Sequence, residues 1–259
     1  MTNEHIEKLQ SLVHSRKPDI TLWAEENHWY KVAGSKHWIP SVTTMLGSVM
    51  NKGYGFEKWL GDMPSYKIAC EERDLAGAIG TLVHKHCETL MSQRLFGLQL
   101  EDCEYGDKVW KRMMSFVEWF KEYKPNVITL EERLAHMDVP WAGTPDIVCV
   151  INGKLCLIDI KTGGAYPTHG LQLTCYKKLW DMIFPEYPIE EMYGLYLKDS
   201  WRTKILPLMK SYDYAPEVAD SVKHIWHWMN GKSAQPKKKF PIKTSFKLPD
   251  FNSNMLEQL

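Results

Sequence analysis

The sequence predicts an α/β fold with an N-terminal helical and hairpin extension. Three segments rich in Val, Ile and Leu, residues 127–134, 145–151 and 155–161, follow two helical segments and precede another helix. Asn152-Gly153 separates the second and third of these segments, and this dipeptide between apolar runs is the strongest short signal for a two-residue hairpin turn. The order helix, three strands, helix, strand is typical of an α/β core.

Residues 1–74 are expected to form helices and a small aromatic hairpin outside this core. Residues 1–17 have the pattern of a short amphipathic helix. Gly34-Ser35 is a turn signal between two aromatic segments in residues 28–39. Glycines at 47, 53 and 55 interrupt residues 43–60, which predicts two short helices joined by a loop.

The core is expected to span residues 75–230. Apolar residues recur at helical spacing in 75–96, and Pro125 stops a second amphipathic helix at 108–123. We expect a helix at 170–184, strands at 193–198 and 205–209, and a last helix at 215–230. Residues 231–259 follow as a basic tail, with six lysines and no acid in 231–249. Such a run is typical of a solvated tail, or of a local contact with phosphates.

Composition and charge exclude several classes of protein. The 259 residues carry 32 Lys+Arg and 32 Asp+Glu, so any contact with a polyanion must be local. The start of the chain has no signal-peptide pattern, and no uncharged run approaches a membrane span, so we expect a cytoplasmic protein without a membrane partner. Six cysteines include no C-x-x-C pair, which disfavours a zinc knuckle or a disulfide framework and predicts reduced, buried thiols.

The predicted hairpin brings two acids together. Counting outward from a type I′ turn at Asn152-Gly153 places Asp146 directly opposite Asp159, as a non-hydrogen-bonded pair with Cα atoms about 4.5 Å apart. Lys161 shares their face, which is otherwise apolar. Because opposed carboxylates repel each other, we expect a bound cation, and hard oxygen ligands favour Mg²⁺ or Mn²⁺. The alternative is that the acids only cap solvent-exposed strand ends.

Two further sets of residues recur at helical spacing. Gly80, His84 and Glu88 are four residues apart, so each step drifts only about 40° and the three share one stripe. Gly80 lets another backbone come close, while His84 and Glu88 offer metal ligands. Gln172 and Tyr176 repeat the spacing on the helix after the hairpin. Taken alone, either set also fits an ordinary amphipathic helix.

In chain order, these elements resemble the RecB-like branch of the PD-(D/E)XK nucleases. The matching elements are Gly80-x-x-x-His84-x-x-x-Glu88, Gly143-Thr144-Pro145-Asp146, Asp159-Ile160-Lys161 and Gln172-x-x-x-Tyr176. The stretch Ile39-Pro40-Ser41-Val42-Thr43-Thr44-Met45-Leu46, followed by Trp59, is similar to a segment of phage recombination exonucleases and of the mitochondrial genome maintenance exonuclease. The resemblance runs from about residue 38 to residue 198. It implies a restriction-endonuclease-like core, with a mixed central β-sheet flanked by helices.

The resemblance also implies roles for the matched residues. The implied ligands of the catalytic metal are His84, Asp146, Asp159 and the Ile160 carbonyl, with Glu88 as a further candidate. Glu131 or Glu132 is a candidate second-metal or outer group.

Lys161 would orient or help deprotonate the attacking water and offset the charge of the phosphorane, and Gln172 and Tyr176 would position the DNA end. The residues implied to contact DNA, from the 1–74 region through which DNA would approach, are Ser41, Thr43, Thr44 and Trp59.

The implied function is a Mg²⁺- or Mn²⁺-dependent deoxyribonuclease, an exonuclease that hydrolyses DNA from its ends in phage-type recombination, replication or repair. Its partners would be DNA ends, single-stranded or duplex, and a single-strand annealing or replication protein in the cytoplasm of a bacterium or a phage-infected cell. The alternatives are a structure-selective or nonspecific endonuclease, and a catalytically silent DNA-binding scaffold, which the opposed acid pair disfavours.

Two further expectations concern cysteines and tryptophans. Some relatives hold an iron–sulfur cluster with C-terminal cysteines, and because no cysteine follows Cys175 we expect no such cluster. Trp23, Trp29, Trp38 and Trp59 lie outside the core segments. They would either stack on unpaired bases or pack within the protein.

Overall fold

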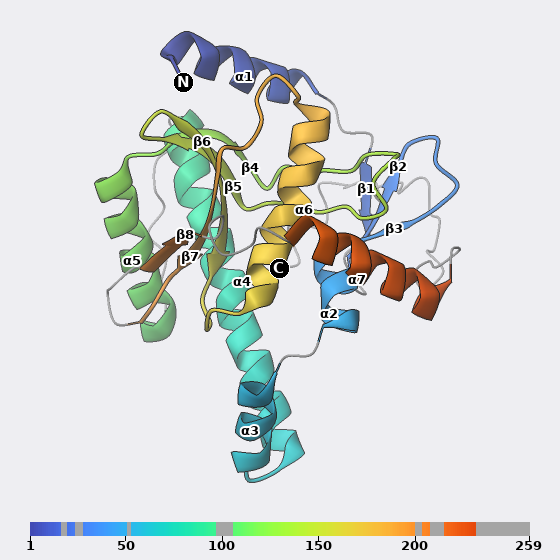
Figure 1. The fold of residues 1–259 in the computed structure, drawn as a ribbon. Helices are drawn as coiled ribbons and strands as arrows, with labels where there is room; N and C mark the ends of the chain where they lie inside the picture. The colour runs from blue at the N-terminus through green and yellow to red at the C-terminus, as the bar shows by residue number, and fades with distance from the viewer. Residues whose placement is uncertain are drawn as a thin grey trace, which may run out of the picture.

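A five-stranded mixed sheet with helices on both faces forms the centre of the molecule (Figure 1). The computed structural model describes residues 1–16, 20–23, 28–50, 53–96, 106–199, 204–207 and 215–231. In spatial order, the strands are β4 (Asn126–Leu130), β5 (Ile147–Ile151), β6 (Lys154–Lys161), β7 (Glu191–Tyr196) and β8 (Lys204–Pro207). The α/β fold class, with a helix-flanked mixed sheet and an N-terminal hairpin extension, is confirmed.

The β5–β6 hairpin has the turn and the register that its sequence predicts. Asn152 and Gly153 both have positive φ, 51° and 80°, as a type I′ turn requires. The antiparallel pairing runs from Ile151 and Lys154 at the turn to Ile147 and Ile158. The two edge strands are antiparallel to their neighbours, β4 to β5 and β8 to β7. β6 and β7 are parallel and are connected through helix α6 (Pro167–Ile183).

The hairpin is buried on both faces. One set of its side chains, which includes Cys149 and Ile158, packs with α4 (Tyr66–Phe96) and α5 (Asp107–Tyr123). The alternate set, which includes Val148 and Leu157, packs with α1 (Asn3–Ser15), α2 (Val42–Val49), α6 and α7 (Ala215–Asn230). The period of two along each strand therefore divides the core into two layers, as the sequence predicts.

A small antiparallel sheet holds the segment that leads into Asp146. Its strands are β1 (Ile20–Trp23), β2 (Trp29–Val32) and β3 (Ile39–Pro40). The β2–β3 hairpin was predicted, but β1 was not, because four residues are too short to show a pattern. The Val42 N–H donates to the Ala142 carbonyl at 2.8 Å, and the Tyr30 and Thr144 hydroxyl oxygens are 2.9 Å apart. The N-terminal sheet is thereby attached to residues 142–144.

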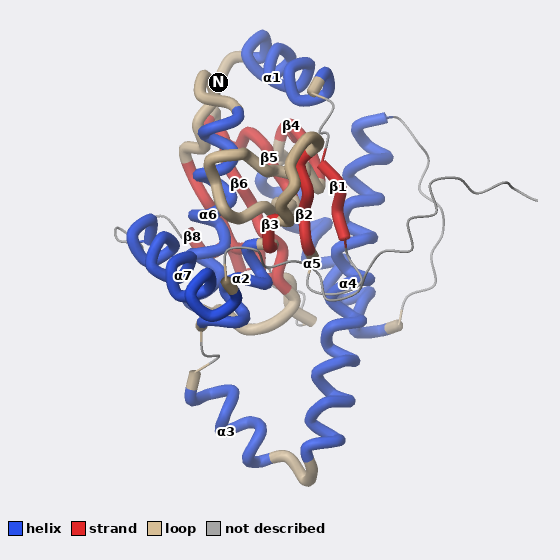
Figure 2. Tube along the Cα trace, turned by 90° about the vertical axis from the view of Figure 1, so that its right-hand side faces the viewer, coloured by secondary structure: helices blue, strands red, loops and turns tan. Residues whose placement is uncertain are grey.

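Helix α3 (Tyr54–Asp62) and the first turns of α4 project from the body of the molecule (Figures 1 and 2). None of the nine residues of α3 is buried. α4 begins at Tyr66, whereas the apolar pattern predicted a helix only from residue 75. Because this first part of α4 packs against little else, it carries no apolar stripe that sequence periodicity could detect.

Three other expectations have plain outcomes. β4 ends at Leu130 rather than at residue 134, because the backbone of Glu131 turns to a φ of 48°. The five described cysteines are free, and all but the half-buried Cys70 are buried, as expected; Cys103 and residues 232–259 of the basic tail lie outside the described residues. None of the described helices combines the length and the apolar character needed to cross a bilayer.

Candidate active site

The candidate site lies at the end of the β5–β6 hairpin that is away from its turn. Four elements meet there: helix α4, the end of β4, the hairpin itself and helix α6. They bring together side chains that the sequence predicted separately, which are His84, Glu131, Asp146, Asp159, Lys161, Gln172 and Tyr176.

One half of the site is a triad that fits a metal ion. His84, Glu131 and Asp146 each offer a ligand atom, and these atoms lie within 4.8 Å of one another. The His84 Nδ1 is 3.4 Å from Asp146 Oδ1. The other Asp146 oxygen accepts a 2.6 Å hydrogen bond from the Ile160 N–H, which fixes the carboxylate. Two carboxylates beside one imidazole suit Mg²⁺ or Mn²⁺, which prefer oxygen ligands.

The other half is a buried network around Asp159. This side chain is 2% exposed and forms an ion pair with Lys161. Gln172 bridges the pair, because its Oε1 accepts from Lys161 Nζ at 3.2 Å and its Nε2 donates to Asp159 Oδ1 at 3.1 Å. The same Nε2 lies 3.0 Å from the Tyr176 hydroxyl oxygen. The i, i+4 pair on α6 therefore holds the D-x-K element of β6.

A glycine lets the two halves come together. Gly143 passes directly under the ring of Tyr176, and a Cβ at this position would lie 2.2 Å from the Tyr176 Cε1 atom. The segment from Gly143 to Asp146 can follow this path only without a side chain there. On α4, a Cβ at Gly80 would lie 3.2 Å from the Thr162 Oγ1, so Gly80 also faces the end of β6.

The acidic side chains of the site favour binding of a cation. Burial raises the pKa of Glu131 to about 8, and the charges of Asp146 and Glu88 add to this rise. Burial also raises the pKa of Asp159 to about 6, with Lys161 opposing the rise and Asp146 adding to it. Burial disfavours the charged form of Asp146 as well, but His84 and Lys161 outweigh it and lower the pKa of Asp146. Without a metal, the folded protein therefore retains protons that a divalent ion would replace.

The structure separates the two glutamates that the sequence left as alternatives. Glu131 joins the triad, whereas Glu132 points to Arg16, whose Nη1 is 3.5 Å from Glu132 Oε1. The Glu131 N–H donates to the Asp146 carbonyl at 3.1 Å, and its φ of 48° turns the chain out of β4. No sequence signal distinguishes the pair. Glu88 is exposed and lies outside the triad, although its charge acts on Glu131.

The opposition of Asp146 and Asp159 stays a prediction. The strand pairing ends at Ile147 and Ile158, one step before these acids. Asp146 instead bonds the backbone N–H of Ile160, and its charge raises the pKa of Asp159. The two carboxylates thus belong to one electrostatic cluster.

The predicted DNA contacts on α2 lie at its N-terminus. Ser41 is buried and caps the helix, because its Oγ accepts from the Thr44 N–H at 3.0 Å. The same Oγ is 3.0 Å from Thr43 Oγ1 and donates to Thr44 Oγ1 at 2.8 Å. Thr43 is exposed and Thr44 is half-buried. Ser41 therefore has a structural role, and contact of these residues with phosphate stays a prediction.

The tryptophans divide between packing and exposure. Trp29 is 7% exposed and packs edge-on against Trp226, with ring centroids 5.9 Å apart, so the base-stacking interpretation is wrong for Trp29 and the packing alternative holds. Trp38 is half-buried, with Lys31 Nζ 5.8 Å from its ring centroid. Trp59 is half-buried on α3, 5.4 Å from the ring of Phe56.

Comparisons with known proteins show distant structural likeness and no match in sequence. No family model and no curated protein matches the sequence. Among solved structures, an alkaline exonuclease (LHK-Exo) from Laribacter hongkongensis matches with a TM-score of 0.28 and 11% identity, over 73% of this chain and 90% of that chain. A likeness at this level carries no argument about activity, so the functional conclusion depends on the site itself.

Proposed function

We propose that the protein is a divalent-metal-dependent nuclease that hydrolyses phosphodiester bonds of DNA from its ends. The observation that carries this proposal is the partly buried cluster at the open end of the hairpin, the end away from its turn. It joins a His84–Glu131–Asp146 triad to an Asp159–Lys161–Gln172 network. Phosphodiester hydrolysis needs these two components side by side, a metal-activated water and a fixed positive charge near the phosphate.

The metal would be held by the triad together with Asp159 and the Ile160 carbonyl, with Glu88 outside them. A bound Mg²⁺ or Mn²⁺ supplies Lewis-acid stabilisation of the phosphate oxygens and lowers the pKa of a water molecule. His84 contributes its imidazole, and because its Nδ1 faces Asp146 at 3.4 Å, metal binding must displace any proton shared between the two groups.

Lys161 would act on the reacting phosphate. Its ammonium group forms an ion pair with Asp159 and a hydrogen bond to Gln172. Burial lowers the pKa of Lys161, but the carboxylates of Asp159 and Asp146 outweigh this effect and raise it, so the group stays charged. A fixed cation stabilises the negative charge that grows on the nonbridging oxygens, and it orients the attacking water. Gln172 and Tyr176 hold this arrangement and would thereby position the DNA end.

The alternative of a silent DNA-binding scaffold does not explain the buried acids. Burying carboxylates beside one another opposes folding, as the raised pKa values of Glu131 and Asp159 record. A scaffold gains nothing from such an arrangement, whereas a metal-dependent hydrolase requires it.

The requirement for an end follows from the charge balance of the chain. With 32 basic and 32 acidic residues, long-range capture of duplex DNA should be weak, so the grip must be local. The motif resemblance supports a role in phage-type recombination, replication or repair, in the cytoplasm and beside a single-strand annealing or replication protein.

The experiment is a time course on one plasmid, as closed circles and after linearisation, with Mg²⁺. Linear DNA should shorten to short oligonucleotides or mononucleotides while the circle persists, and EDTA should stop the reaction. Comparable nicking of the closed circle would establish an endonuclease instead. Absence of metal-dependent cleavage of either form would refute the proposal.

A further inference from the structure

A cluster of aromatic and basic side chains lies next to Lys161, outside the residues assigned above. It consists of Tyr166, His169, Tyr196 and Lys198, which we call the nucleotide cluster. Tyr166 and His169 come from the start of α6, and Tyr196 and Lys198 come from the end of β7. Tyr196 is the direct strand partner of Lys161 in the parallel β6–β7 pair. Ligands of α/β sheets typically bind beyond the carboxyl ends of parallel strands, and the cluster lies at such a position.

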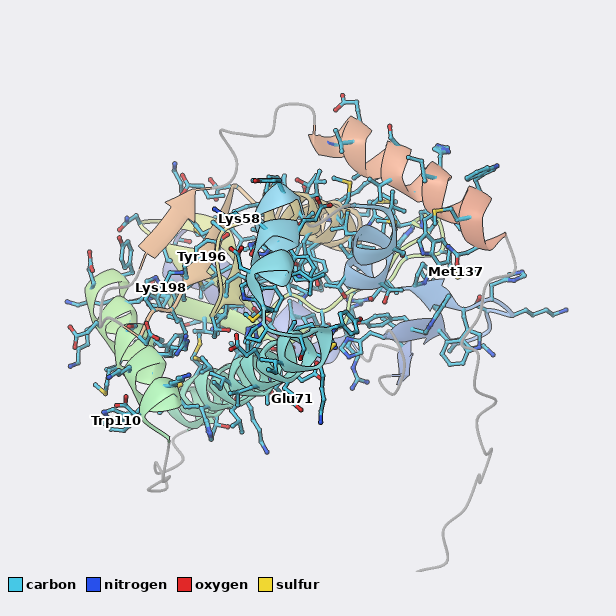
Figure 3. The ribbon with its side chains drawn as sticks, turned by 90° about the horizontal axis from the view of Figure 1, so that it is seen from below. Lys58, Glu71, Trp110, Met137, Tyr196 and Lys198 are labelled. Atoms are coloured by element: carbon cyan, nitrogen blue, oxygen red, sulfur yellow. The ribbon has the colours of Figure 1, made fainter. Side chains whose placement is uncertain are left out.

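Contacts on both sides fix Lys198 and Tyr196. Lys198 Nζ donates to the Gly163 carbonyl at 2.8 Å and lies 5.9 Å from the Tyr196 ring centroid, and the two residues are neighbours in Figure 3. The buried Ser115 on α5 donates its hydroxyl to the Lys198 carbonyl at 2.8 Å. Gly194, the strand partner of Asp159, makes room for Tyr196, because a Cβ there would lie 2.7 Å from the ring.

His169 links Tyr196 to an exposed aromatic ring. Its Nδ1 is 2.8 Å from the Tyr196 hydroxyl oxygen, so one imidazole nitrogen is engaged by the protein. Burial, together with the charge of Lys161, lowers the pKa of His169 to about 4, so the imidazole is neutral at pH 7. Tyr166 packs edge-on against this imidazole, with centroids 5.6 Å apart, and is 48% exposed. Its exposed ring follows the exposed Gly163 and Gly164, which leave the adjacent backbone uncovered.

We propose that the nucleotide cluster is a binding subsite for the nucleotide next to the scissile phosphate of a DNA strand, with the base on Tyr166 and the neighbouring phosphate at Lys198 and His169. This subsite rests on the proposed nuclease function. An exposed ring, a held ammonium group and a neutral imidazole match the base and the phosphate of one nucleotide. Base–aromatic stacking tolerates any sequence, as an enzyme that degrades DNA from its ends requires.

The test is steady-state cleavage of a single-stranded oligonucleotide by the full chain in Mg²⁺. Tyr166→Ala should raise KM about tenfold, within the range of about 5- to 150-fold that the loss of one stacking contact allows. Its kcat should change less than threefold. Tyr166→Phe should restore KM, because stacking needs the ring and not the hydroxyl. Trp228→Ala, which removes an 83% exposed ring on α7, is the matched control and should leave KM unchanged.

The salt dependence of KM in Lys198→Met is a second measurement, and a purely structural role of Lys198 would leave it unchanged. Loss of one phosphate contact should reduce the slope of log KM against log salt by about 0.7, the value for one charge on a single strand. Lys154→Met, at the other end of the sheet, should leave the slope unchanged.

The outcomes separate this inference from the proposed function. Wild-type protein that cleaves neither this oligonucleotide nor linear duplex DNA in Mg²⁺ overturns both. Metal-dependent cleavage of linear duplex DNA without cleavage of the oligonucleotide overturns the subsite alone. Wild-type cleavage with a KM for Tyr166→Ala equal to that for Trp228→Ala overturns the subsite alone. Equal losses in Tyr166→Ala and Tyr166→Phe, or an unchanged salt slope in Lys198→Met, also contradict the subsite.

Discussion

At its turn, the β5–β6 hairpin carries an exposed ion pair between Lys154 and Glu191, whose side chains are 54% and 27% exposed. At its open end, the ion pair between Asp159 and Lys161 is 3% and 20% exposed, and the charge of a second acid, Asp146, acts on both partners. Water screens the first pair, so it contributes little to folding. The second pair has lost most of its hydration, which is costly unless the charges are fully compensated.

The difference between the two ion pairs indicates that the open end of the hairpin is not arranged for stability alone. Both ends belong to the same antiparallel hairpin of β5 and β6. A cavity of about 410 Å³ lies near the turn, lined among others by Trp119, Asn152 and Tyr193, but it holds none of the predicted catalytic residues. The proposed functional end therefore depends on the concentration of charge with little exposure to water, rather than on the presence of a cavity.

The largest difference between the ends should appear when their lysines are compared. Lys161→Met removes a charge needed as the phosphorane forms and keeps the apolar stem, so kcat should fall by about 10²–10³ with little change in KM. Lys154→Met, on the same strand, should retain full activity. The measurement is steady-state kinetics on linear DNA, with circular dichroism to confirm folding. A loss in KM alone would assign Lys161 to binding.

A smaller effect is expected from the packing of Tyr176 over Gly143. Gly143→Ala places a methyl group 2.2 Å from the tyrosine ring, so the ring or the 143–146 segment must move. We expect a loss of unfolding free energy of about 1–3 kcal/mol and reduced activity. Gly77→Ala, on α4 with no atom within 4 Å, should not destabilise the protein and is the control. Urea unfolding of both variants checks this, and equal stability would show that the site relaxes freely.

A milder change is expected from Tyr176→Phe. It removes one hydrogen bond to Gln172, whereas Gln172 keeps its bonds to Asp159 and Lys161. One neutral hydrogen bond contributes about 0.5–1.5 kcal/mol, so the effect should be roughly 2- to 10-fold and should appear mainly in KM or in the choice of DNA end. A loss in kcat as large as that of Lys161→Met would contradict this division of roles.

The last prediction concerns pH and the metal-free protein. The pKa of Glu131 is raised to about 8 in the folded state, so the folded state binds more protons than the unfolded state between about pH 4.5 and 8. The free energy of unfolding should therefore fall as pH rises through this window. Glu131→Gln should flatten the fall and be more stable than the parent at pH 8, measured by urea unfolding in EDTA. A variant less stable than the parent at pH 8 would contradict the buried acid cluster.

The hairpin could be predicted well from the sequence because its turn and its register depend on residues close together in the chain. The turn residues set the register, the register set the faces, and together these placed Asp146, Asp159 and Lys161 at one end. Residues joined by long-range contacts were harder to predict. The choice of Glu131 over Glu132 depends on one backbone turn and on Arg16, which is distant in the chain. The nucleotide cluster depends on the parallel β6–β7 register, which no turn encodes.

The N-terminal region illustrates the same limit. Aromatic composition alone could not separate a stacking surface from a packed layer, and Trp29 packs on Trp226 from the far end of the chain. The capping role of Ser41 was equally hidden, although a serine before an apolar helix is a common N-cap.

The most direct test of the central claim, that the open end of the hairpin is a metal-dependent nuclease site, is Asp159→Asn. The substitution keeps the shape of the side chain and removes one carboxylate charge. Hydrolysis of linear DNA in Mg²⁺ should fall about a thousandfold or more. Stability should hold or rise, because burial already disfavours the ionised form and raises its pKa to about 6. Activity within a few-fold of the parent, in protein free of contaminating nuclease, would contradict the claim.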